Sequence, residues 1–229
     1  MLWYSSAIFV IALGFIISLY ANIRVRTTYN KFSKIGNSKN ITGDEAARRI
    51  LDSAGLRNVE IEHIRGNLTD HYDPRSQVLR LSEGVYGSTS IAAIGIAAHE
   101  AGHAIQHATK YSPLIIRNSI VPVVNIATNA SWIIFLIGFA FSGNGGITLM
   151  NIGIVLFTFA VLFQLITLPV ELNASKRAVE QIETVSIGDD EDVQGVKKVL
   201  SAAAMTYVAA LLVALLQLFR LIVLRGSRD

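Results

Sequence analysis

Charged side chains are absent from three long stretches of the sequence, and this absence constrains the fold more than any other feature. No Asp, Glu, Lys or Arg occurs in residues 1–23, 118–170 or 199–219. A helix of about 20 apolar residues can cross a bilayer. Because backbone groups in lipid must be satisfied within the segment itself, these stretches predict membrane-spanning helices.

The middle stretch is long enough for two spans and has a turn signal, residues 142–146, near its centre. We therefore expect a helical hairpin, residues 118–141 and 147–168, with Pro169 helping to end its second helix. The first stretch is predicted to be an anchor rather than a signal peptide, because no base precedes it and Leu19 occupies the position that should be small. Residues 202–223 are a fourth candidate.

Basic residues near the span ends predict the orientation. The bases that follow the first stretch are Arg24, Arg26, Lys31, Lys34 and Lys39, and Arg117 precedes the hairpin. This pattern places residues 24–117 and 171–198 in the cytoplasm. Four full spans would leave Arg225 and Arg228 outside, so the sequence does not decide whether the fourth segment crosses completely.

Composition supports a membrane protein and excludes several other classes. Charged residues make up 16% of the chain, against about 25% in ordinary soluble domains, and there is no cysteine. Disulfide scaffolds and cysteine-ligated metal sites are therefore excluded. The net charge of +3 is small and the bases form no stripe, so we expect the lipid bilayer and no nucleic acid as a partner.

The polar segments read as a small α+β domain. Thr42 and Glu45 form a capping-box pattern that predicts the start of a helix, and Gly55 is expected to end this helix. Residues 59–64 and 78–82 resemble strands, and residues 91–108 are predicted to form a second helix. Residues 70–75 read as a polar turn, and the acidic run 189–192 as a solvated helix start. The predicted fold is a mainly α membrane protein with several transmembrane helices and this small domain.

The most informative motif is His99-Glu100-Ala101-Gly102-His103, which matches H-E-x-x-H inside the predicted helix. Residues four apart share a helix face, so both imidazoles can bind one Zn²⁺. Glu100 is placed to handle the proton of a zinc-bound water, whose pKa falls from about 15.7 towards about 7. The small apolar residues before His99 predict a buried helix, where unpaired His and Glu side chains would be costly without a metal.

Catalytic zinc usually has a third protein ligand, which must come from elsewhere. His63, His71 and several acids are candidates on residues alone, and Glu171, the first charged residue after the hairpin, is the strongest. The other interpretation of Glu171 is an acid at a helix start. His107 continues the histidine series, but three ligands on one straight helix would spread over about 12 Å, so we expect it to be structural or to support the ligands.

Four segments together resemble one family, the YugP-type neutral zinc metallopeptidases of bacterial membranes: residues 70–75, 79–82, 97–107 and 171–178. The likeness covers most of the chain, and HtpX-like and CAAX-prenyl membrane proteases are more distantly similar. It implies a gluzincin with a zincin-like domain, in which His99, His103 and Glu171 hold one catalytic Zn²⁺. Ser175 stands where those relatives have an aspartate, so it cannot supply that charge.

The resemblance also implies catalytic roles. Glu100 would act as general base and acid, and His71, Tyr72 and Arg177 are candidates to stabilise the oxyanion. An edge strand near such a site holds extended substrate in metallopeptidases. The expected function is hydrolysis of peptide bonds in polypeptides, with damaged membrane proteins as a substrate class by analogy. The expected location is the bacterial cell membrane, as a multi-pass protein whose catalytic part faces the cytoplasm.

The expected domains follow the runs of charge: a transmembrane anchor (1–23), a catalytic domain (24–117), a transmembrane hairpin (118–168), a catalytic segment with the third ligand (169–198), and a fourth hydrophobic helix with the C-terminal tail (199–229). The sequence specifies neither the oligomeric state nor a partner protein.

Two alternatives remain open at this point. A site-2-type intramembrane protease would carry its motif within a span, but only 15 uncharged residues precede His99 and no Leu-Asp-Gly occurs. A non-catalytic membrane scaffold or adaptor would keep zinc for structure, although structural sites are usually closed by four ligands.

Overall fold

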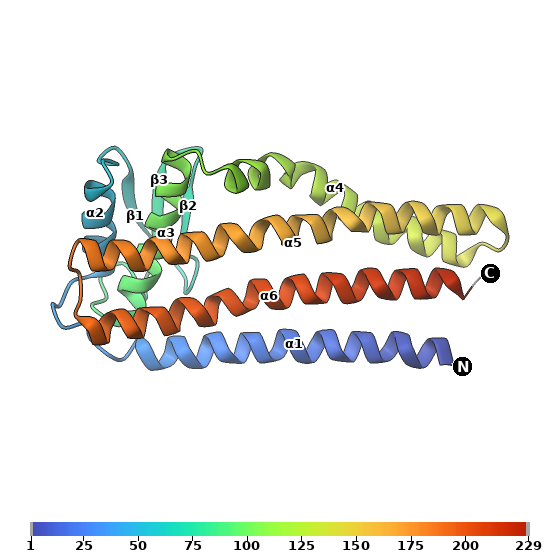
Figure 1. Cartoon of the computed structure of the whole chain (residues 1–229), viewed down its shortest axis with the longest axis horizontal. Coiled ribbons are helices and arrows are strands. Elements are labelled where there is room, and N and C mark those ends of the chain that lie inside the picture. The colour runs from blue at the N-terminus through green and yellow to red at the C-terminus, as the bar shows by residue number, and fades with distance from the viewer. Residues whose placement is uncertain (1, 228–229) are drawn as a thin grey trace. The chain divides into compact units, whose positions relative to one another are not determined.

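The computed structural model describes residues 2–227, which are mainly helical with one small sheet (Figure 1). The elements are α1 (Leu2–Phe32), α2 (Gly43–Ser53), β1 (Glu60–Ile64), β2 (His71–Asp73), β3 (Val78–Ser82), α3 (Ile91–Ala108), α4 (Ser112–Ala140), α5 (Asn144–Thr184) and α6 (Asp190–Gly226). The chain divides into two compact units, one of Met1–Asn22, Ile116–Leu168 and Thr206–Asp229, the other of Ile23–Ile115 and Pro169–Met205.

Four helices in the described chain are long and apolar enough to cross a membrane: Ile8–Phe32, Ser112–Ala140, Asn144–Thr184 and Asp190–Gly226. Each of them overlaps one of the stretches that lack charge and extends beyond it to charged residues. Within the first unit, α4 and α5 pack closely through glycines. A Cβ on Gly153 would lie 2.8 Å from Phe135 Cβ, and Phe135 is itself buried at this contact. Small residues let the backbones of membrane helices approach in this way.

The prediction that Pro169 helps to end a helix is wrong. Helix α5 begins at Asn144, inside the predicted turn, and continues through Pro169 to Thr184. A proline inside a helix loses a backbone hydrogen bond and crowds the preceding turn. The residues beyond it offset this cost, because Val170, Ala174 and Ala178 are completely buried in the second unit.

The sheet of the second unit has the order β1-β3-β2, with β1 parallel and β2 antiparallel to β3 (Figure 1). β3 is its central strand and carries the buried Val78, Leu79 and Leu81. The strand predictions at 59–64 and 78–82 agree with β1 and β3. The prediction of a turn at His71 and Tyr72 is wrong, because both belong to β2. β2 has only three residues, and the last of them, Asp73, begins an Asp-Pro turn signal, so no period is visible in the sequence.

Two predicted helix starts differ in outcome. Thr42 caps α2 by accepting from the Glu45 N–H, and Gly55 follows the helix with φ of 75°. The acidic start of α6 was expected to be solvated, but Asp192 is buried and accepts hydrogen bonds from the Ser38 N–H and hydroxyl at 2.9 and 2.6 Å. Burial of this carboxylate joins the start of α6 to the segment that follows α1.

Helix α3 forms the centre of the second unit and packs on α2 and the sheet. Ser90 caps it by accepting from the Ala93 N–H at 3.1 Å. Its buried surface consists largely of alanine and glycine, so neighbouring helices approach its backbone. A Cβ on Gly102 would lie only 2.6 Å from the Ala174 carbonyl oxygen of α5. Gly102 therefore sets how closely α5 approaches α3.

We predict that Gly102→Ala destabilises the protein by about 1–3 kcal/mol, because the added methyl group would overlap backbone that cannot move away cheaply. Thermal unfolding of the purified full-length protein in detergent measures this effect. Gly87→Ala is the matched control, since a Cβ there would have nothing within 4 Å. Equal melting temperatures for the two variants would contradict the proposed close contact.

Candidate metal centre

Two helices bring three side chains with metal-ligating atoms to one point. His99 and His103 lie one turn apart on α3, and Glu171 lies on α5 just after Pro169. Glu171 Oε2 is 3.3 Å from His99 Nε2 and 3.4 Å from His103 Nε2. One ligand atom from each residue lies within 4.8 Å of the others. Residues 68 positions apart in sequence thus form one donor set.

The donor set fits a zinc ion. Tetrahedral zinc has bonds of about 2.0–2.1 Å to histidine nitrogen and carboxylate oxygen, which requires about 3.3–3.4 Å between ligand atoms. The two distances from Glu171 match that spacing. The Glu171 side chain is only 6% exposed. A buried carboxylate facing two imidazoles is costly unless a cation lies between them.

Gln106 fixes which nitrogen of His103 faces the site. The completely buried Gln106 amide donates to the Val170 carbonyl at 2.8 Å and to Asn173 Oδ1 at 3.0 Å. Its Oε1 therefore faces His103 Nδ1, at 3.0 Å, as an acceptor. Since Oε1 can only accept, Nδ1 must carry the proton, and the neutral ring presents the Nε2 lone pair towards Glu171.

The same network continues along α5. Asn173 Oδ1 also accepts from Arg177 Nε at 2.9 Å, and the Arg177 guanidinium lies 5.9 Å from the centroid of the Tyr111 ring. Arg177 is thus linked to His103 through hydrogen bonds of Asn173 and Gln106. In this structure the predicted oxyanion residue Arg177 bonds Asn173.

Ser175 occupies the corresponding place beside the other histidine. Its hydroxyl lies 3.2 Å from His99 Nδ1. A hydroxyl that accepts from Nδ1 leaves Nε2 unprotonated and facing Glu171, as Gln106 does for His103. The serine supplies this orientation without the negative charge of an aspartate.

Glu100 is held by the backbone of the neighbouring strand. The Tyr72 N–H of β2 donates to Glu100 Oε2 at 3.1 Å. The Tyr72 hydroxyl lies 2.9 Å from His107 Nδ1 on α3. Burial, and secondarily the charge of Asp73, raises the pKa of Tyr72 above its ordinary value of 10.0, so this hydroxyl stays protonated at neutral pH. Glu100 therefore lies at the outer edge of β2, on the side that does not pair with β3.

Two histidines considered as third ligands lie outside the donor set. His71 is exposed, and its Nδ1 is 2.8 Å from the Thr69 carbonyl oxygen. His63 is exposed on β1 with its ring 5.1 Å from that of Tyr86. His107 also lies outside the donor set, and its Nδ1 is 2.9 Å from the Tyr72 hydroxyl.

Comparison with known proteins identifies the family. Residues 7–226 match the family model described as "Putative neutral zinc metallopeptidase". The chain belongs to this family. It is 49% identical over 213 residues to the protein named "Putative membrane protease YugP" of Bacillus subtilis (strain 168), an alignment that covers 93% of this chain and 92% of that protein. No solved structure matches.

Membership in the neutral zinc metallopeptidase family implies zinc as the cofactor, and the donor set of two histidines and a glutamate is compatible with it. Sequence reasoning missed Gln106 and Asn173, which support His103. A signal for Gln106 exists in its spacing, because a residue three positions after a ligand lies beside it on the helix surface. Asn173 carries no such signal, since its partner is 67 residues away.

We predict that Gln106→Leu weakens zinc binding about 10–100-fold, because residues that orient a ligating histidine typically have effects of this size. Zinc affinity measured by competition with a chromogenic chelator tests this. Gln181→Leu is the control, since Gln181 bonds Ser53 and none of the ligand atoms. Unchanged affinity in the Gln106 variant would show that Gln106 does not position His103.

Proposed function

We propose that this protein is a membrane-embedded zinc endopeptidase, with zinc held by His99, His103 and Glu171 and with Glu100 as general base and acid. The observation that carries the proposal is the approach of the Glu171 carboxylate to the Nε2 atoms of His99 and His103. Glu100 directly follows His99 on the same helix. Membership in the zinc metallopeptidase family supports the same chemistry.

When bound, zinc would act as a Lewis acid that makes water a nucleophile at neutral pH. Glu100 accepts the proton from the attacking water and delivers it to the amine of the departing product. The Tyr72 N–H orients the Glu100 carboxylate for both transfers. Three protein donors leave a further position for water and substrate, which is typical of catalytic rather than structural zinc.

Strand β2 is the best-placed element for substrate. It lies at the edge of the sheet, and its Tyr72 contacts both Glu100 and His107. We propose that an extended polypeptide lies along this edge and pairs with the β2 backbone groups that Glu100 leaves free, since backbone hydrogen bonds give affinity. Among His71, Tyr72 and Arg177, we favour Tyr72 as oxyanion donor, because its N–H bonds Glu100 and the residue therefore lies beside the proposed site.

We propose that the second unit faces the cytoplasm, because basic residues follow the first apolar stretch and Arg117 precedes the second. We propose that damaged or mis-inserted membrane proteins are the substrates, on the analogy of other membrane metallopeptidases. Helix α3 is not among the four candidate spans found in residues 2–227, which favours cleavage outside the hydrocarbon layer over a site-2 mechanism.

We predict that Glu100→Gln lowers the rate of peptide hydrolysis at least about 10²–10⁴-fold, because the amide cannot accept the proton of the attacking water. Zinc content should remain one per chain, since Glu100 is not a ligand in this proposal. Cleavage of a fluorogenic protein substrate and metal analysis of the same preparation measure both quantities. Glu180→Gln, at an exposed position of α5, is the control. Full activity of Glu100→Gln would favour a non-catalytic zinc protein instead.

The ligand set is tested by replacing His99, His103 and Glu171 one at a time with alanine. We expect each replacement to abolish stoichiometric zinc, because two protein ligands hold the ion far less tightly than three. Metal analysis after extensive dialysis is the measurement. Zinc retained by the Glu171 variant alone would return the third position to one of the other candidate residues.

A further inference from the structure

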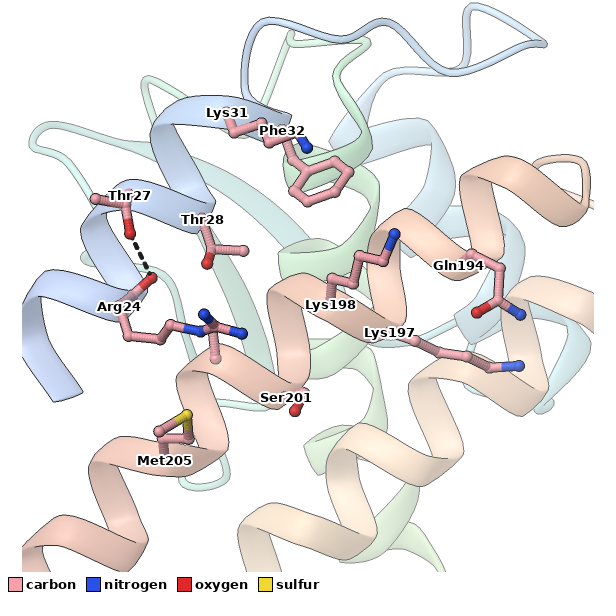
Figure 2. Close-up of a pocket in the computed structure, with 11 residues that line it drawn as sticks. Arg24, Thr27, Thr28, Lys31, Phe32, Gln194, Lys197, Lys198, Ser201 and Met205 are labelled. Carbon is pink, nitrogen blue, oxygen red and sulfur yellow. Dashed lines mark hydrogen bonds between the residues drawn. The ribbon is translucent and has the colours of Figure 1, made fainter. Parts of the chain in front are cut away.

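A basic cavity in the second unit lies away from the three ligands. It has a volume of about 440 Å³ and is bounded by the C-terminal part of α1 and the N-terminal part of α6 (Figure 2). Its lining consists of Arg24, Thr27, Thr28, Lys31, Phe32, Gln194, Lys197, Lys198, Ser201, Ala202 and Met205. None of these residues takes part in the proposed hydrolysis.

The lining carries four cations and no acidic residue. Lys197 pairs with Glu183 at 3.1 Å, and Lys31 lies 5.4 Å from the centroid of the Phe32 ring. Arg24 and Lys198 are both exposed, and within residues 2–227 neither forms an ion pair with an acidic side chain. Figure 2 shows Arg24 extending from α1 towards α6, where Lys198 lies. Among the described residues, Arg24, Lys31 and Lys198 thus share one cavity without an acidic partner, which favours an anionic ligand.

The cavity lies where the apolar stretches end. Arg24 is the first charged residue after the stretch 1–23, and Lys198 is the last before the stretch 199–219. Along α6 the lining changes from charged to apolar towards the C-terminus, from Lys197 and Lys198 through Ser201 to Ala202 and Met205. A ligand that fits both parts has a negatively charged head and an apolar body.

The walls of the cavity are fixed by packing on either side. A Cβ on Gly195 would lie 2.7 Å from Ile91 Cγ2 and 3.1 Å from Phe32 Cε1, so α6 lies close to both α1 and α3 here. Asp192 bonds Ser38 one turn earlier on α6. A preformed cavity binds with a smaller ordering cost than a flexible basic tail would.

We propose that this cavity binds the phosphate headgroup of an anionic phospholipid, with Arg24 and Lys198 as its principal contacts. Arginine and lysine both bind phosphate well, and basic pockets between membrane helices on the cytoplasmic side recognise anionic headgroups. A lipid accounts for the charge and for the apolar continuation along α6, whereas a free phosphate ion accounts for the charge alone. The site is independent of the zinc chemistry.

The test titrates dioctanoyl phosphatidylglycerol into purified full-length protein in a neutral detergent and follows binding by intrinsic fluorescence or isothermal calorimetry. Dioctanoyl phosphatidylcholine and inorganic phosphate are the comparison ligands. The double variant Arg24→Gln/Lys198→Gln removes the two proposed contacts. The control Arg26→Gln/Lys34→Gln removes the same amount of charge from bases that follow the first apolar stretch and lie outside the lining.

We expect phosphatidylglycerol to bind the Arg24/Lys198 variant about 30-fold more weakly than the unmodified protein, since each cation near an anionic lipid contributes about fivefold. The Arg26/Lys34 control should bind within about twofold. Zinc content and lipid-free melting temperature should stay unchanged in both. If the double variant fails to fold, Lys198→Gln alone replaces it, with about fivefold weaker binding expected.

Three results would overturn the proposal. Equal weakening in the two variants would show a diffuse charge effect of the juxtamembrane bases. Equal binding of phosphatidylcholine would show that the headgroup charge is not recognised. Inorganic phosphate that binds as tightly as the lipid would identify a soluble anion as the ligand.

Discussion

The approach of one carboxylate to two imidazoles is the constraint on which the second unit depends. Glu171 must lie within coordination distance of ligands on another helix, and this requires α5 to approach the backbone of α3. Alanine and glycine on α3 make that approach geometrically possible, as the contact of Gly102 with Ala174 shows. Buried residues after Pro169 stabilise the helical course that carries Glu171 into place.

Orientation of the ligands depends on a few neutral side chains. Gln106 accepts from His103, and Ser175 is placed to accept from His99, so both rings direct an unprotonated nitrogen to one point. Neither residue brings a charge, which leaves Glu171 as the one acidic member of the donor set. With a single anion in the donor set, a bound zinc ion would be a stronger Lewis acid than with several.

Patterns that extend over many consecutive residues were sufficient to predict α3 and the apolar segments, because each residue repeats the signal given by its neighbours. The H-E-x-x-H spacing predicted that His99 and His103 share one helix face, and Glu171 was already the strongest sequence candidate for the third ligand. In the structure its carboxylate lies 3.3 and 3.4 Å from the two Nε2 atoms. Short or long-range features were not predictable in this way. β2 has three residues, the buried Asp192 depends on Ser38 at a separation of 154 residues, and Asn173 supports a histidine through Gln106.

The part of α5 that belongs to the first unit is long enough to cross a bilayer on its own. It runs from Asn144 to Leu168, and these 25 residues at about 1.5 Å per residue extend over about 37 Å along the helix axis. The hydrocarbon layer of a bilayer is about 30 Å thick. Because Glu171 comes after this part of the helix, its carboxylate is free to face other side chains without shortening the stretch that crosses the lipid.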